Sequence, residues 1–371
     1  MRVSVVRGGA VAVLAGLLAL CGCTGFFVPV TTTNGGGNTS SSANWAYVAN
    51  TATRTVSGFA VGTGTLTSAG NMPQDVTYAP QALAMANGYL YVAVPGAIYP
   101  YAIASDGSLT AVAGAVLVNA VAMDVSPDGN WIAALDAINT QVDILSLNSS
   151  TGAAALAGTV AYGASGTALS PKAVKFAPNG ALVFAALGAG GDAIFTFNTA
   201  TGATVLSGTL AAPNAQTSDN ALAVDSTSTH LYVARSGTSG GLAVYSIGNA
   251  GALTALAGSP FAAGTQPLAV LLDSTGSYAY VANGSDGTIS GYALASGKPT
   301  ALASSPFASG VEVRSLALDA TGKYLLAVAQ GGAPDLTLYS FDATSGGKLD
   351  PVATAASGTD PAGSIAVVSG N

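Results

Sequence analysis

Cysteine is almost absent from this chain of 371 residues. The two that occur, Cys21 and Cys23, lie near the start, so no intrachain disulfide can form in the chain that follows Cys23. Charge is scarce as well: 7% of the residues are charged against 50% hydrophobic ones. This composition lies far from that of disordered chains. The fold must therefore be stabilised by the burial of apolar side chains.

Residues of the types that commonly act in catalysis are equally few. His230 is the sole histidine and Glu312 the sole glutamate. The sequence has no nucleophile elbow, no cluster of zinc ligands and no glycine-rich phosphate loop followed by a helix. We interpret His230 as a turn residue, since a lone histidine without a placed partner has no catalytic mechanism.

Two aspartates suggest calcium at first sight. Asp124 and Asp128 lie close together in Asp-Val-Ser-Pro-Asp-Gly, but the segment offers too few oxygen ligands, and Pro-Asp-Gly is common turn chemistry. We expect no metal and no cofactor.

The first residues predict export with a lipid anchor. Two arginines precede the apolar run 8–20, which is too short for a resident transmembrane helix. The run ends in Leu-Cys-Gly-Cys, which resembles the bacterial lipobox because Cys23 follows the small residue Gly22. We expect a signal peptide over 1–22, lipidation of Cys23 and attachment to a membrane through the lipid. The alternative is an ordinary secreted protein with two incidental cysteines.

Residues 23–44 are expected to form the lipidated cysteine and a flexible tether, because Thr31–Asn44 is polar and rich in glycine and serine. Thr24 after the anchor, in place of aspartate, favours an outer membrane or cell surface within the cell envelope. Loss of Arg2 and Arg7 leaves eight basic residues against 17 acidic ones, a formal charge of −9. Nucleic acid is therefore not expected as a partner.

From residue 45 to residue 371 the sequence repeats a unit of short apolar strands with a period of two residues. No stretch has the period of an amphipathic helix. The clearest strand recurs seven times, at separations of 41 to 51 residues, which suits propeller blades of four strands. The copies are Ala46–Asn50, Leu90–Ala93, Trp131–Ala134, Leu182–Ala185, Leu231–Ala234, Ala279–Asn283 and Leu325–Val328.

Six units have an inner strand before this segment, and the first has none. The polar tether cannot supply it, whereas Ser364–Val368 near the C-terminus is an unassigned apolar run. We predict an all-β, seven-bladed β-propeller of four-stranded antiparallel blades, closed by the C-terminal strand joining the first blade. A β-solenoid is the alternative, although its coils are shorter and more uniform.

The units resemble a known repeat. Tyr280-Val281-Ala282-Asn283, followed by Thr288–Tyr292, is similar to the YVTN repeats of lactonase-like seven-bladed propellers, which include 6-phosphogluconolactonase-like proteins. The resemblance covers nearly all of residues 45–371 and implies the propeller fold and a ligand site at one mouth of the channel. Such lactonases often carry histidines in the loops that enter the inner strands. None of the corresponding loops here holds one.

Propeller connectivity places every arginine of the mature chain, and the only glutamate, on that rim. A binding or scaffold module is the first hypothesis, with a protein, a glycan or a small anion as partner and arginine suited to a carboxylate or phosphate. A lactone hydrolase is the alternative, with Glu312 as base. The predicted rim residues are Arg54, Gln81, Lys172, Arg235, Glu312 and Arg314, whereas Lys298, Lys323 and Lys348 are expected on the opposite face. Solvated side chains, or a simple pairing of Glu312 with Arg54 or Arg314, would also explain this rim.

Overall fold

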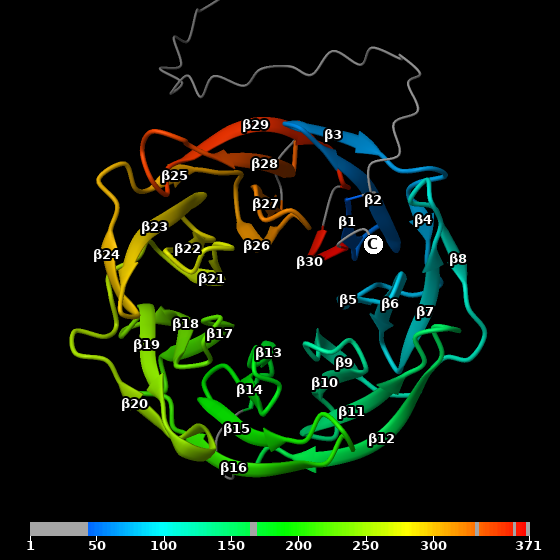
Figure 1. Ribbon diagram of the computed structural model, residues 1–371, viewed down its shortest axis with the longest axis horizontal. Helices are drawn as coiled ribbons and strands as arrows, with labels where there is room; N and C mark the ends of the chain where they lie inside the picture. Colours follow the sequence, from blue (N-terminus) through cyan, green and yellow to red (C-terminus); the bar gives the residue numbers. More distant parts are fainter. Residues whose placement is uncertain (1–43, 164–168, 331–333, 359–360, 369–371) are drawn as a thin grey trace, which may run out of the picture.

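The computed structural model describes residues 44–163, 169–330, 334–358 and 361–368. Seven antiparallel sheets stand around a central axis, which confirms the predicted seven-bladed β-propeller (Figure 1). The only helical element among the described residues is the short 3-10 turn η1 (Asn249–Gly251). No helix in this part of the chain is long and apolar enough to cross a membrane.

Each blade is an antiparallel sheet of four main strands, which we call inner, second, third and outer in the order from the axis to the circumference. The inner strands of blades 1 to 7 are β30 (Pro361–Val368), β5 (Ala82–Ala86), β9 (Ala120–Val125), β13 (Ala173–Phe176), β17 (Thr217–Val224), β21 (Pro267–Leu272) and β26 (Val313–Leu318). The second strands are β1 (Trp45–Asn50), β6 (Tyr89–Val94), β10 (Trp131–Asp136), β14 (Leu182–Ala186), β18 (His230–Gly237), β22 (Tyr278–Asn283) and β27 (Tyr324–Ala329).

The third strands are β2 (Thr55–Gly62), β7 (Ala97–Ile103), β11 (Gln141–Leu147), β15 (Asp192–Phe197), β19 (Gly241–Ile247), β23 (Thr288–Ala295) and β28 (Leu336–Phe341). The outer strands are β3 (Thr65–Ser68), β8 (Leu109–Ala111), β12 (Ala154–Ala161), β16 (Thr204–Leu210), β20 (Leu253–Ala255), β24 (Lys298–Ala301) and β29 (Leu349–Ala355). Two further short strands, β4 (Gln74–Asp75) and β25 (Phe307–Ala308), pair with β2 and β23.

The ring closes as the sequence predicts. The C-terminal strand β30 pairs antiparallel with β1, so that Tyr47 lies opposite Ala366 and Val48 opposite Ile365. β30 also lies beside the inner strands β26 and β5 of the two neighbouring blades. Residues 44–371 therefore contain every strand of the ring, and this fragment is the folding unit that we use in the experiments below.

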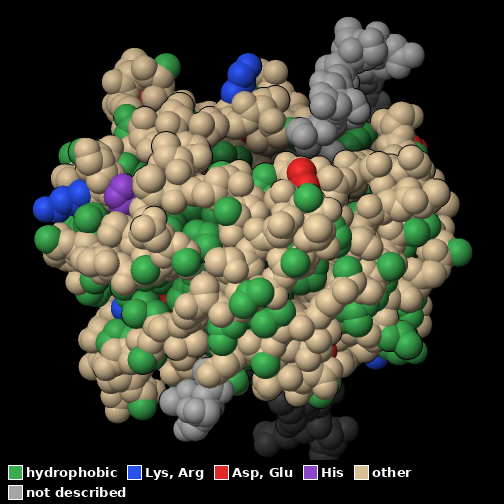
Figure 2. Space-filling view, turned by 60° about the horizontal axis from the view of Figure 1, so that its bottom comes forward, with side chains coloured by type: hydrophobic (Ala, Val, Ile, Leu, Met, Phe, Trp, Pro, Cys, Tyr) green, Lys and Arg blue, Asp and Glu red, His purple; other side chains and the backbone are tan. Residues whose placement is uncertain are grey.

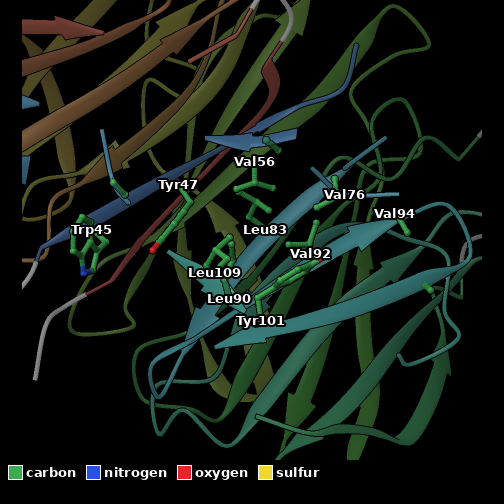
Figure 3. Packing of buried hydrophobic residues seen from close by; sticks show 13 residues of the cluster. Trp45, Tyr47, Val56, Val76, Leu83, Leu90, Val92, Val94, Tyr101 and Leu109 are labelled. Atoms are coloured by element: carbon green, nitrogen blue, oxygen red, sulfur yellow. The ribbon is translucent and has the colours of Figure 1, made fainter. Parts of the chain in front are cut away.

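The core lies between the blades. Buried hydrophobic residues form clusters, each shared by two neighbouring sheets. Figure 3 shows the cluster between blades 1 and 2, where Tyr47 and Val56 of one sheet face Leu83 and Leu90 of the next. Full burial of one such side chain stabilises a fold by roughly 1.5–3 kcal/mol. Successive side chains of a strand point to opposite faces of its sheet, and apolar side chains on both faces suit a sheet that is covered on both sides.

The tyrosine of the repeat joins consecutive blades. The hydroxyl of Tyr47 donates a hydrogen bond of 2.7 Å to the carbonyl of Gly107 in blade 2, and that of Tyr280 donates one of 2.8 Å to Gly347 in blade 7. Gly107 has a φ of 78°, and a Cβ there would lie 2.5 Å from the ring of Trp45. Glycine is thus required both by the turn and by the close approach of the neighbouring blade.

The asparagine of the repeat holds a loop in place. The Asn283 amide nitrogen donates to the hydroxyl of Ser290 at 2.9 Å, and its carbonyl oxygen accepts from the backbone N–H of Gly264 at 3.0 Å. Asn283 is fully buried. The residues that carry the family resemblance therefore build blades.

Candidate functional site

Strand direction divides the surface of the ring into two faces. The inner strands begin, and the second strands end, on the same face because neighbouring strands are antiparallel. We call this the mouth face. The turns from inner to second strands and from third to outer strands lie on the opposite face.

A cavity of about 560 Å³ occupies the channel at the axis of the ring. Its described lining comes from the inner strands of blades 2 to 7. Many lining side chains are aliphatic, and each inner strand is the end strand of its sheet, so that one of its backbone edges faces away from the sheet. Polar side chains also border the cavity, among them Asp124 and Asn220.

Two of the predicted rim cations line this cavity, Lys172 and Arg314. Lys172 is exposed and precedes β13, whereas Arg314 is the second residue of β26 and is partly buried. One terminal nitrogen of Arg314 contacts Glu312 Oε2 at 2.9 Å. Its Nε is buried and has no hydrogen-bond partner among the described residues. The Arg314 side chain as a whole is 39% exposed, so the accessible part of its guanidinium can donate to an acceptor that a ligand supplies.

An ion pair lies in the same wall. Lys175 Nζ contacts Asp124 Oδ1 at 2.8 Å, and the other oxygen of Asp124 accepts a hydrogen bond of 2.7 Å from the backbone N–H of Phe176. Asp124 is 18% exposed, so its carboxylate is held between blades 3 and 4 yet still reaches the cavity. Asn220 also lines the cavity, with its amide nitrogen bonded to the carbonyl of Pro267 at 2.7 Å.

Arg235 lies elsewhere, although it too stands on the mouth side of its strand. Its side chain is 4% exposed and makes a two-pronged pair with Asp219, at 2.5 Å from Nε and 2.9 Å from a terminal nitrogen. The Tyr245 hydroxyl lies 2.9 Å from the same terminal nitrogen. The guanidinium is thus committed inside the protein, and in this structure it cannot present a free fork to a ligand.

A second carboxyl group lies beside this pair. Asp192 is 1% exposed, and neither of its oxygens has a hydrogen-bond partner among the described residues. Burial and the charge of Asp219 raise the pKa of Asp192 well above its usual range, despite the opposing effect of Arg235. Asp192 therefore keeps its proton to a higher pH than an ordinary aspartate does.

The remaining predicted rim residues lie around the mouth without lining the cavity. Arg54 is exposed in the turn between β1 and β2, and Gln81 is partly buried just before β5. The side chain of Glu312 is 53% exposed and pairs with Arg314. This pairing was one of the alternatives that the sequence left open.

His230 has a structural role on the opposite face. Its Nδ1 lies 2.9 Å from Asp225 Oδ2, and its ring lies so close to Gly297 that a Cβ there would come within 2.4 Å of it. This agrees with its interpretation as a turn residue. Asp128 accepts from the Ser126 hydroxyl and from the backbone N–H of Asn130, as turn chemistry predicts. No three His, Cys, Asp or Glu side chains gather as a metal site in the described ranges.

The sequence analysis missed Asp124, Lys175 and Asn220 as lining residues of the cavity. A signal existed for Lys175, because it is a charge inside the predicted inner strand Ala173–Phe176, where only the channel can solvate it. Sequence alone gave no such signal for Arg235. Aligning Ala221 with Ala234 would place Asn220 opposite Arg235, and a bulge between Asp219 and Ala221 brings Asp219 there instead.

Fold and cavity together define a closed seven-bladed β-propeller with a cation-lined channel. Residues 188–310 match the model of the family described as "Lactonase, 7-bladed beta-propeller". This match covers 123 of the 371 residues and agrees with the resemblance of the repeats to those of lactonase-like seven-bladed propellers. No curated protein matches the sequence.

Solved structures share this fold at low sequence identity. A proposed 6-phosphogluconolactonase from Bacteroides uniformis is 16% identical with a TM-score of 0.72, over 88% of this chain and 100% of that one. One from Bacteroides fragilis is 15% identical with a TM-score of 0.73, over 90% and 100%. The periplasmic gluconolactonase of Pseudomonas aeruginosa is 18% identical with a TM-score of 0.69, over 89% and 100%. Identities this low support the fold alone.

Proposed function

We propose that this protein is a binding module for a small anion that carries hydroxyl groups, such as a sugar acid, held in the channel cavity. The observation that carries the proposal is the 39% exposed side chain of Arg314 in a cavity that Lys172 also lines. Two cations suit a carboxylate or phosphate group. The polar side chains of Asp124 and Asn220, which also line the cavity, suit the hydroxyls.

Calorimetric titration of the 44–371 fragment tests this. We expect gluconate or 6-phosphogluconate to bind, and glucose, which lacks the charge, to bind at least about 10-fold more weakly. Arg314→Ala and Lys172→Ala should each weaken binding of the anion by about 10-fold, the effect of about 1.4 kcal/mol. Lys298→Ala removes a cation from the opposite face and is the matched control.

Equal affinity for glucose and gluconate would contradict the role of the charge. Binding that survives both Arg314→Ala and Lys172→Ala would move the ligand away from this cavity.

A lactone hydrolase is the second candidate. The structurally similar proteins are described as a 6-phosphogluconolactonase and a gluconolactonase, and Asp124 puts a carboxylate in the wall of the same cavity. In this candidate Arg314 and Lys172 would stabilise the negative charge that develops on the lactone oxygen. Asp124 or Glu312 would accept a proton from the attacking water.

The two candidate functions differ in whether the protein converts a substrate. The hydrolase predicts acid release from glucono-1,5-lactone above the spontaneous rate, followed by titration at constant pH. Asp124→Asn and Glu312→Gln test the two bases, and Asp128→Asn, in a turn outside the cavity, is the control. Release that neither test substitution reduces would exclude both proposed bases.

We also propose that the protein is lipid-anchored to the cell envelope through Cys23, which lies outside the described residues. In support, the chain enters the ring on the opposite face, where the Asn44 amide donates to Asp319 Oδ2 at 2.7 Å in the turn between β26 and β27. An anchor before this point leaves the mouth accessible. Metabolic labelling with palmitate should mark the full chain and its Cys21→Ser variant but not Cys23→Ser. Equal labelling of all three would reject Cys23 as the anchor.

A further inference from the structure

The seven outer edges of the ring are not alike. In blades 1, 2, 5 and 6 the outer strand has only three or four residues. The rest of the third strand is covered there by a separate segment: β4, β25, or the single bridges of Ile98 with Val116 and of Leu242 with Phe261. In blades 3, 4 and 7 the outer strands β12, β16 and β29 run without interruption over seven or eight residues.

A long free strand edge invites pairing with another chain, and proteins usually protect it with charge or proline. β29 has both protections. It contains Pro351 and Asp350, whose carboxylate lies 2.5 Å from Lys348 Nζ. β12 (AALAGTVA) and β16 (TVLSGTL) contain neither proline nor a charged residue. All three strands have one bulge, so the bulge does not distinguish β29 from the other two.

Exposed apolar side chains mark the same two strands. Leu156 on β12 is 48% exposed and Val205 on β16 is 63% exposed. The other large hydrophobic side chains exposed in the described ranges lie in loops. β12 and β16 are neighbours along the circumference of the ring (Figure 1). Figure 2, in which this lower edge comes forward, shows mostly uncharged side chains and backbone there.

We propose that the outer edges of blades 3 and 4 form the surface through which a second copy of this chain associates. The chain carries a formal charge of −7, so two copies repel each other unless they meet through an uncharged face. These two strands provide one, and the same edge on each copy suits a twofold contact. Because two copies must meet, the association depends on concentration. It leaves the mouth face free for a ligand.

Sedimentation velocity of the 44–371 fragment over a concentration series tests the proposal. The wild-type fragment is expected to move from monomer to dimer as the concentration rises. Leu156→Lys and Val205→Lys place a charge on the two edges, and each should weaken dimerisation by about 10-fold. Thr110→Lys adds the same charge to the exposed, short β8 and is the control. Circular dichroism establishes that each variant keeps the fold.

Three results would overturn the proposal. A wild-type fragment that stays monomeric at the highest concentration has no such surface. A dimer that persists in the Leu156→Lys, Val205→Lys double variant forms elsewhere. Equal weakening by Thr110→Lys would show that charge anywhere on the circumference, and not these two edges, decides association.

Discussion

A fragment that ends at Gly358 is expected to show no cooperative unfolding transition. The deletion removes β30, which supplies the inner strand of blade 1 and fills the ring between β26 and β5. Without it the fully buried β1 is left with an unpaired inner edge, and burial of unpaired backbone groups is costly. Urea titration followed by circular dichroism measures the effect, and we expect essentially all of the folding free energy to be lost.

Two controls sharpen this experiment. A fragment that ends at Val368 keeps β30 and should unfold like the 44–371 fragment. A peptide of residues 359–371, added to the truncated fragment, should restore a cooperative transition by taking the place of β30. Normal stability of the truncated fragment without the peptide would show that circular closure is dispensable.

Arg235→Met is expected to lower the free energy of unfolding by about 3–5 kcal/mol. The substitution keeps much of the side-chain volume but leaves Asp219 buried without its partner. Removal of one member of a buried ion pair costs about this much, because the remaining charge stays desolvated. Urea unfolding at neutral pH measures the change. Arg54→Met alters an exposed cation and should change stability by no more than about 0.5 kcal/mol.

Asp192 gives this experiment a second variant. When a carboxyl pKa is raised by folding, the folded state binds the proton more tightly, so stability is greatest at low pH and falls as the pH rises above the usual aspartate value of about 4. Asp192→Asn removes that loss and should raise stability at neutral pH, because a neutral amide need neither hold a proton nor bury a charge on folding. The stability of the Asp192→Asn variant should also depend less on pH than that of the wild-type fragment.

The two substitutions should be coupled. Without Arg235 the carboxylates of Asp192 and Asp219 repel each other, so Arg235→Met should cost less in the Asp192→Asn background. Additive effects, or a loss below about 1 kcal/mol for Arg235→Met alone, would show that the pair is solvated and that Arg235 is available at the mouth.

Much of the fold could be predicted because its signals are local and repeated. An apolar alternation with a period of two, broken by turns, indicates strands, and seven copies of one strand give the number of blades. Even the closure followed from one missing inner strand and one unassigned run at Ser364–Val368. The lengths of the outer strands did not follow, because β4 and β25 are too short to give a pattern.

The site could be predicted only in part. Connectivity places Lys172 and Arg314 on the mouth face, and both line the cavity. It places Arg235 on the same face, where cross-strand pairing with Asp219 buries it. A rare cation on a loop and a rare cation at a strand end look alike in sequence. They differ in the neighbours that adjacent strands supply, which for Arg235 are Asp219 on β17 and Tyr245 on β19.

The sequence by itself determined the class of fold, the seven blades and the circular closure, since six blades are contiguous along the chain and the first lacks one strand that the end of the chain supplies. Only the tertiary structure decided which charges remain available and which edges remain uncovered. Arg314 borders the cavity, whereas Arg235 meets Asp219 and Tyr245. The physical reason is that solvation and pairing depend on which side chains the strand register brings together, and a bulge sets Asp219 opposite Arg235.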